Sequence, residues 1–282
     1  MRLASLLLAS SITVIAASQQ QRALMPSHAD NGIAYYGGTV MTAPAGVNLY
    51  YIWYGDWSKH PATAILTDLA RTLGGSPFFN INTTYFDAGG AHVVNAVNFL
   101  GSVNDAYSQG STPTLSQVQT IVSHAISGGL PADPNGVYMV LTSQDVVPAG
   151  FCNRLCGLSR TFSLNGTNIK FAWVGNAARC PGTCAPAQPT TGPNGDVGAD
   201  AMAATLAHLL TNSITNSSTT GWHNASNQGP GSICATSETA FPVTYLAPNG
   251  ARASVHLGAR DFLLQANWVN ENGGYCSVSY RR

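Results

Sequence analysis

Apolar residues follow two spacings along the chain, one typical of strands and the other of helices. Residues 47–54 are rich in β-branched and aromatic side chains and end at Gly55, which predicts a strand. Unbroken apolar runs at 137–141 and 169–174 predict two further, buried strands. We interpret the aromatic residues of the first strand, with Trp57 beyond it, chiefly as core, although one face of such a strand can be exposed for binding.

Two helices have clear start and stop signals. Pro61 stands where a first helical residue is expected, and apolar residues then follow at helical spacing until the glycine pair 74–75. The second helix begins at Thr114, with Gln117 at the position that completes a capping box. Its apolar stripe ends at the glycine pair 128–129, so each helix presents one apolar face to a core.

A third helical face lies at 202–210, and we expect Asp200 to cap the helix that carries it. Asp196 is interpreted as a turn residue that bonds its own backbone. Short strand-like pieces with Gly and Asn turns fill 244–280. Because strands alternate with helices in the first half, the pattern predicts one mixed α/β domain with a central sheet, over residues 33–282.

Residues 1–18 have the pattern of a secretory signal peptide. Arg2 precedes an apolar stretch from 3 to 17 that ends in small residues suited to cleavage. This stretch is shorter than the roughly 18–20 residues needed to span a bilayer. The alternative, a buried helix of the mature domain, is disfavoured by the polar run 19–21. We expect 19–32 to be a flexible leader and the mature protein to be secreted, without a membrane span.

Charge excludes several kinds of partner. Charged residues are only 9% of the chain, and 12 Lys and Arg balance 12 Asp and Glu. A chain without net charge does not attract nucleic acid or an anionic membrane. Solubility must then come from uncharged polar groups and attached sugar. Four sequons are candidate glycosylation sites where they lie on exposed loops: Asn82, Asn165, Asn216 and Asn224.

The six cysteines allow fifteen pairings, and the sequence does not choose among them. They are Cys152, Cys156, Cys180, Cys184, Cys234 and Cys276. The two Cys-x-x-x-Cys pairs are also compatible with a zinc site, but an oxidising export route favours three disulfides. Cys234 and Cys276 form a plausible distant pair, which leaves the other four to cross-link the central region.

Several segments in order resemble the EXORDIUM, or phosphate-induced protein, family, which also has bacterial relatives. The resemblance covers about 240 residues, and all six cysteines fall where that family has them. It rests on Tyr35–Gly38, 47–55, Asn135–Asp145 with the cysteines that follow, Phe171–Asn176, Pro193–Asp200 leading to His208, and Gln265–Val269.

The resemblance implies a zincin-like metal site, which this chain has altered. In the family, the helix after Pro-Asn-Gly-Asp usually carries His-Glu-x-x-Glu, whose ends share a helix face, with a further acid before a later Cys. Here His208 is followed by Leu209 and Asn212, and the later acids are replaced by Gly229 and Ser232. Leu cannot take a proton, and Asn is a weak ligand, so His208 is interpreted as a vestige of a lost zinc site.

Of two further features of the family pattern, this chain changes one and keeps the other. A Thr-Asp turn becomes Thr215-Asn216, now a sequon, whereas Trp222 is retained. The two glutamates, Glu238 and Glu271, do not have the motif spacing. His223 is a candidate replacement ligand, although it lies 15 residues after His208 and outside common zinc spacings.

Other hydrolytic chemistry has little support. No Gly-x-Ser-x-Gly is present, and paired cysteines leave no thiol nucleophile. A glycosidase needs two facing carboxylates, and nothing in the sequence brings any two of Asp145, Asp196 and Asp200 together.

The sequence therefore predicts a secreted, disulfide-linked glycoprotein with a degenerate metal site and no cofactor. We expect it to be non-catalytic and to act at the cell wall, in the apoplast or at a host–microbe boundary, in growth or signalling. Its expected partner is an extracellular protein or a cell-wall polysaccharide. The alternatives are a zinc-dependent hydrolase with substituted ligands and a structural wall protein.

Overall fold

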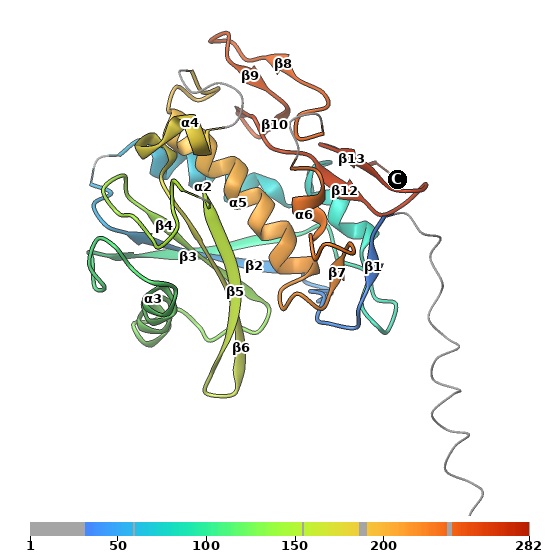
Figure 1. Ribbon diagram of the computed structural model, residues 1–282, viewed down its shortest axis with the longest axis horizontal. Coiled ribbons are helices and arrows are strands. Elements are labelled where there is room, and N and C mark those ends of the chain that lie inside the picture. Colours follow the sequence, from blue (N-terminus) through green and yellow to red (C-terminus); the bar gives the residue numbers. More distant parts are fainter. Residues whose placement is uncertain (1–31, 59, 154, 186–190, 236–238, 282) are drawn as a thin grey trace, which may run out of the picture.

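The computed structural model describes residues 32–58, 60–153, 155–185, 191–235 and 239–281. The predicted signal peptide and nearly all of the predicted leader lie outside these residues. The rest of the chain folds into the expected mixed α/β domain (Figure 1).

A five-stranded sheet with the order β3-β2-β4-β6-β5 forms the centre of the domain. Its strands are β2 (Val47–Tyr54), β3 (Val97–Asp105), β4 (Gly136–Thr142), β5 (Gly157–Leu164) and β6 (Thr167–Val174). The first four in spatial order are parallel, and β5 runs antiparallel to β6 at one edge. β4 is buried throughout and β2 nearly so, which explains why both read as continuous apolar runs.

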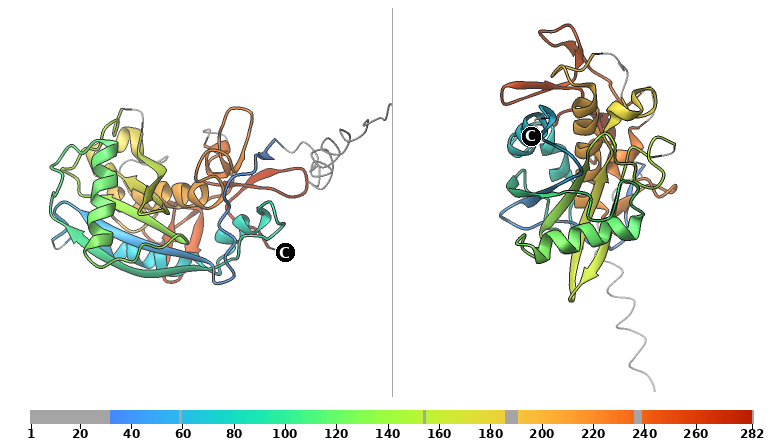
Figure 2. Two further views of the ribbon diagram at one scale, coloured as in Figure 1. Left: turned by 90° about the horizontal axis from the view of Figure 1, so that it is seen from below. Right: turned by 90° about the vertical axis from the view of Figure 1, so that its left-hand side faces the viewer.

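Helices cover both faces of this sheet (Figure 2). α3 (Leu115–Ser127) packs Val118, Ile121 and Val122 against one face, and the predicted capping box of Thr114 and Gln117 is present. α2 (Ala62–Leu73) and α5 (Val197–Thr215) share the opposite core. The aromatic residues of β2 divide between these two cores, so the core interpretation is confirmed.

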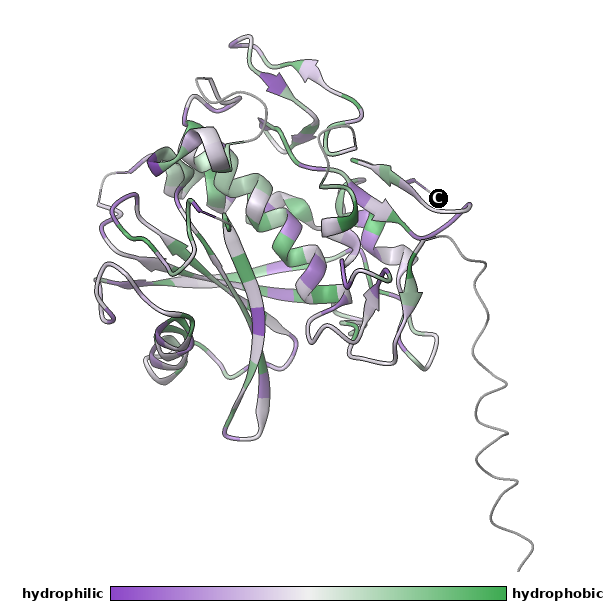
Figure 3. Ribbon diagram, in the orientation of Figure 1, coloured by the Kyte–Doolittle hydropathy of each residue, from purple (hydrophilic) through white to green (hydrophobic). Residues whose placement is uncertain are grey.

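α5 is a 19-residue helix whose residues are mostly buried, and Figure 3 shows many hydrophobic residues along it. The predicted cap is wrong by one turn. Asp196 is the N-cap, and its carboxylate accepts from the backbone N–H of Ala199 at 2.9 Å. Asp200 lies inside the first turn, where Asn194 donates two hydrogen bonds to its carboxylate, at 2.6 and 3.0 Å. Any capping role at Asp200 is thus replaced by a buried contact with the preceding loop.

Small elements before and after α5 complete the domain (Figure 1). The remaining ones are β1 (Ala34–Tyr35), η2 (Phe79–Thr84), η3 (Ala177–Arg179), α4 (Pro181–Cys184), β7 (Trp222–His223), α6 (Pro230–Ile233), β8 (Tyr245–Leu246), β9 (Arg252–Ala253), β10 (Val255–Leu257), β11 (Arg260–Phe262), β12 (Asn267–Val269) and β13 (Tyr275–Ser277). The strand-like pieces predicted for 244–280 form three separate antiparallel pairs, β8–β9, β10–β11 and β12–β13.

All six cysteines form disulfides. The predicted distant pair, Cys234–Cys276, joins the end of α6 to β13. The central four pair as Cys152–Cys180 and Cys156–Cys184, which link the approach to β5 with the segment after β6. These bonds use every cysteine, so the zinc reading of the Cys-x-x-x-Cys pairs is excluded.

Candidate functional site: a polar cleft at His208

A cleft of about 600 Å³ lies between the edge strand β5 and the second half of α5. One wall consists of consecutive residues 157–161 of β5, and the other contains His208, Leu209 and Asn212 of α5. The rest of the lining is mostly polar and comes from the segments after α5: Asn216, Ser217, Ser218, Thr219, Asn227, Gly229 and Ser232. Arg160 is the single charged residue among those that line it.

His208 is the centre of a hydrogen-bonded group from three elements. Its Nε2 lies 3.2 Å from the amide nitrogen of Asn212, one turn along α5, and 3.3 Å from the hydroxyl of Ser232 on α6. Asn212 also donates to this hydroxyl at 3.0 Å. On the other side of the ring, the amide nitrogen of Gln265 lies 3.3 Å from Nδ1. The i and i+4 positions therefore meet as helical geometry requires.

The surrounding backbone fixes how these amides are turned. The oxygen of Asn212 accepts from the N–H of Gly231 at 3.1 Å, and Gln265 donates to the carbonyl of Gly231 at 2.6 Å. Both side chains therefore present N–H groups to His208. A neutral imidazole has one N–H, and only the Ser232 hydroxyl can accept it. We assign the proton to Nε2, which donates to Ser232, and the acceptor role to Nδ1, which accepts from Gln265. The Asn212 amide nitrogen then lies beside Nε2 in contact with it but is not its hydrogen-bond partner.

His208 remains neutral at ordinary extracellular pH. Burial lowers the pKa of its imidazole from 6.5 to about 4, because the charged form loses more hydration than the neutral form. Few acceptors are available to compensate, since the neighbouring amides face the ring with donors. The ring is thus a fixed hydrogen-bonding group and not a base that is half-protonated near neutral pH.

The groups at this point do not fit a zinc ion. Zinc in proteins takes thiolate, imidazole or carboxylate ligands, whereas His208 is joined here by an amide and a hydroxyl. The Asn212 oxygen, its better ligand atom, is turned to the N–H of Gly231. Among the described residues, no three His, Cys, Asp or Glu side chains are grouped as metal ligands.

The structure brings together most of the positions singled out by the degenerate motif. His208, Asn212 and Ser232 are in mutual contact, and a side chain at Gly229 would meet the Asn212 oxygen at 2.7 Å. Leu209 lines the same cleft and is 6% exposed. The altered positions therefore form one site in space, although 24 residues separate His208 from Ser232.

The other motif residues lie elsewhere. Trp222 is buried in the main core, and its indole donates to the carbonyl of Phe86 at 2.8 Å. His223 lines a separate hollow, where its ring stacks on Tyr36 at 3.8 Å between centroids. Glu271 hydrogen-bonds to the Tyr280 hydroxyl, and Glu238 lies outside the described residues. His223 therefore does not join His208 in the cleft.

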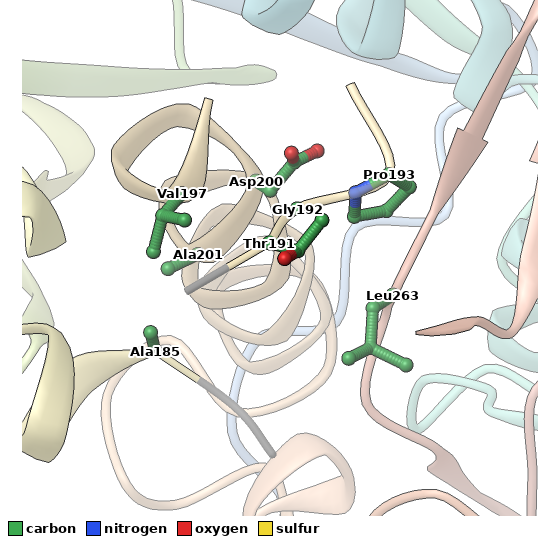
Figure 4. Close-up of a pocket in the computed structure, with 8 residues that line it drawn as sticks. All are labelled: Ala185, Thr191, Gly192, Pro193, Val197, Asp200, Ala201 and Leu263. Carbon is green, nitrogen blue, oxygen red and sulfur yellow. The ribbon is translucent and has the colours of Figure 1, made fainter. Parts of the chain in front are cut away.

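The three aspartates considered for glycosidase chemistry each have a local partner. Asp145 follows β4 and accepts from Ser143 at 2.6 Å and Tyr107 at 2.7 Å. Asp196 caps α5. Asp200 borders a cavity of only about 10 Å³ beside the 191–193 loop (Figure 4), which is room for about one water. Burial raises the pKa of Asp200 to about 6.

Burial separates the four sequons into two groups. Asn82 is fully buried and donates to the carbonyl of Phe79, and Asn216 is 9% exposed and accepts from the N–H of Gly221. A glycan at either would require local unpacking, so the packing favours the other two sequons as glycosylation sites. Asn165 is exposed in the β5–β6 turn, and Asn224 is partly exposed in a loop.

Two parts of the cleft escaped the sequence analysis. Gln265 belonged to a resembling segment, but its place beside His208 depends on the fold of the C-terminal hairpins. β5 was not predicted because its side chains are mostly half-buried and polar. The Asn165-Gly166 pair, a strong hairpin signal, was the available clue.

Comparison with known proteins relates the chain to proteins named EXORDIUM, EXORDIUM-like or PHOSPHATE-INDUCED. The family described as phosphate-induced protein 1 conserved region matches residues 33–251. EXORDIUM-like 3 of Arabidopsis thaliana is 32% identical over 217 residues, which are 68% of this chain and 64% of that protein. PHOSPHATE-INDUCED 1 of Nicotiana tabacum is 28% identical over 256 residues, 79% of this chain and 77% of that protein. EXORDIUM of Arabidopsis thaliana is 26% identical over 244 residues, 76% and 74% respectively.

Three further findings accompany this comparison. The chain spans less than two thirds of the first two curated relatives, 64% of EXORDIUM-like 3 and 59% of EXORDIUM-like 5. No solved structure matches the chain. In the described part of the chain, none of the helices has the length and apolar character needed to cross a membrane. From the matched residues 33–251, the chain belongs to the phosphate-induced protein 1 family.

Proposed function

We propose that this protein is secreted and acts outside the cell by binding a ligand in the His208 cleft, without catalysing a reaction. Family membership supports this location, as do three disulfides, which persist in oxidising compartments. The N-terminal signal pattern supports it as well. The cell wall and the apoplast are the proposed places of action.

One observation carries the non-catalytic proposal. The ring of His208 contacts a neutral amide and a hydroxyl at the positions where a metal site would have acids. Leu209 occupies the position of a general base, and no Asp or Glu is among the residues that line the cleft. Such a lining offers neutral hydrogen-bond donors and acceptors, which suit recognition better than proton transfer.

The first test is the metal content of secreted, glycosylated protein purified without chelator. We expect less than about a tenth of an equivalent of zinc by elemental mass spectrometry, with no change in His208→Ala. Near one equivalent that disappears in His208→Ala would overturn the proposal. It would favour the alternative function, a metal-dependent hydrolase with substituted ligands.

The second test asks whether the cleft binds. Isolated cell-wall material, with its proteins retained, is the probe in a sedimentation assay. Ser232→Phe fills the cleft beside His208, and we expect it to reduce retention at least tenfold. Ser116→Phe is the matched control, because Ser116 is exposed on α3 across the sheet. Equal retention of both variants would contradict binding in the cleft.

A further inference from the structure

β5 leaves one side of its backbone free along the cleft. Among the described residues it pairs only with β6, and residues 157–161 line the cleft directly. An edge strand whose backbone groups are unpaired can add another extended chain. Here that edge coincides with the one large polar cleft that contains His208.

The register shows which backbone groups are available. The N–H of Gly175 donates to the carbonyl of Cys156 at 3.0 Å, which marks residues 156 and 175 as a hydrogen-bonded pair. At the other end, Leu164 pairs with Thr167 across a two-residue turn whose φ angles are 50° and 82°. Hydrogen-bonded pairs alternate in an antiparallel ladder. Residues 158, 160, 162 and 164 therefore bond to β6.

It follows that the N–H and C=O groups of Gly157, Ser159 and Thr161 point away from β6. The Ser159 carbonyl accepts from the guanidinium of Arg160 at 2.8 Å. Within the described chain, the other outward groups of these three residues have no recorded partner. Alternate residues thus present a donor and an acceptor at the spacing of an extended polypeptide.

We propose that the ligand is an extended peptide segment of an extracellular protein, which pairs with the free edge of β5 and places a side chain in the cleft at His208. This inference rests on the proposed binding function and names its partner class. A polysaccharide lacks the alternating N–H and C=O groups that the edge matches. The peptide is therefore preferred to the sugar polymer, which becomes an outcome of the test.

The cleft also restricts the side chains of that peptide. Its lining contains no acid to pair with a lysine or arginine, and its single ionised group is Arg160. Leu158 and Leu209 add apolar surface beside the hydroxyls and amides. A neutral or acidic segment is accepted, whereas a basic segment would lose hydration without gaining an ion pair.

The experiment selects random linear 12-residue peptides displayed on phage against the glycosylated wild-type protein. A synthetic peptide from the selection is then methylated at each backbone nitrogen in turn. We expect losses of at least tenfold in affinity at alternate positions and little change between them, because only every second N–H faces β5. The selected sequences should be poor in Lys and Arg.

Thr161→Pro removes an outward N–H from β5 without removing a bond to β6, and we expect it to weaken the peptide at least tenfold. Thr161→Val is the matched control, because it keeps the N–H and the branched shape, and it should bind normally. Thermal unfolding checks that both variants fold. If Thr161→Pro does not fold, the methylation pattern on wild-type protein still decides.

Failure of this inference is distinguishable from failure of the proposed function. No enriched peptide, or a peptide that tolerates every methyl group, overturns strand pairing. If wall oligosaccharides on a glycan array bind instead and Ser232→Phe abolishes their binding, the cleft function stands and the peptide is wrong. If Ser232→Phe also leaves retention by wall material unchanged, both proposals fall.

Discussion

The two halves of α5 place ionisable side chains in opposite surroundings. At its first turn, Asp200 faces a cavity of about 10 Å³ and accepts two hydrogen bonds from Asn194. Eight residues later, His208 faces a cleft of about 600 Å³. Burial raises the pKa of Asp200 to about 6 and lowers that of His208 to about 4.

The difference shows that one end of α5 has a structural role and that the other end is suited to ligand recognition. At the closed end, polar groups satisfy each other and leave no space for a ligand, so they hold the 191–194 loop to α5. At the open end, the group around His208 borders free volume and the free edge of β5. A perturbed pKa alone therefore does not identify a binding site, because both ends have one.

The largest expected effect comes from removing the disulfide that holds α6, the short helix that carries Ser232. The Cys234–Cys276 disulfide closes a loop of 42 residues and fixes α6 beside His208. Cys234→Ser/Cys276→Ser should lower the free energy of unfolding by about 4 kcal/mol through the greater entropy of the unfolded chain. Urea denaturation measures it, and a loss below about 1 kcal/mol would show that α6 is held by packing alone.

The next effect concerns pH. As pH falls from 6.5 to 4, His208 is protonated in the unfolded chain before it is protonated in the folded protein. This difference lowers the free energy of unfolding as the solution becomes more acidic. Asp200 acts in the opposite sense, because stability falls as pH rises from 3.8 to 6. In the wild type these slopes oppose each other between about pH 4 and 6.

His208→Gln removes one side of this balance. The stability of the variant relative to wild type should increase by about 3 kcal/mol between pH 7 and pH 4, since a pKa unit is worth about 1.4 kcal/mol. Urea unfolding at a series of pH values measures this difference, which cancels other titrating groups. A difference that does not vary with pH would mean that His208 titrates normally.

A smaller effect is expected from substitutions that restore carboxylates of the family pattern around His208, at the open end of α5. Asn212 and Ser232 both contact the imidazole, so Asn212→Glu/Ser232→Asp supplies two carboxylates around His208. We expect zinc affinity to rise at least tenfold over wild type, or about 1.4 kcal/mol. Isothermal titration calorimetry measures it, with the same variant carrying His208→Ala as control. Equal affinity in that control would place the metal elsewhere.

The smallest effect on stability is expected from removing glycans at the two exposed or partly exposed sequons. Thr167→Ala and Ser226→Ala abolish the sequons of Asn165 and Asn224 without changing either asparagine. Each should remove one glycan from the intact mass and change the free energy of unfolding by no more than about 0.5 kcal/mol. A glycan at buried Asn82 or Asn216 would contradict the packing at those positions.

Sequence patterns predicted the buried parts of the fold better than its edges. β2, β4 and most of β6 could be predicted from the sequence because burial on both faces requires continuous apolar runs. β3 and β5 were missed because each forms an edge of the sheet and is only half-buried. The cap of α5 was misplaced because two aspartates, four residues apart, both have capping chemistry, and only Asp196 has the extended backbone of a cap.

The candidate site was predictable in its residues but not in its shape. The degenerate motif singled out His208, Asn212 and Ser232, which do converge. Its hydrogen-bond directions depend on the backbone of Gly231, and its far side depends on Gln265 and β5. These groups come from distant segments, so no local pattern specifies their approach.

The position of Arg160 bears on self-association. Residues 157–164 form β5, so two copies that paired antiparallel through this edge about its middle would bring their Arg160 side chains close together. Like charges that are directly opposite destabilise a strand pair. The edge is therefore protected from forming dimers and fibrils of its own kind, while it stays accessible to a neutral or acidic strand from another protein.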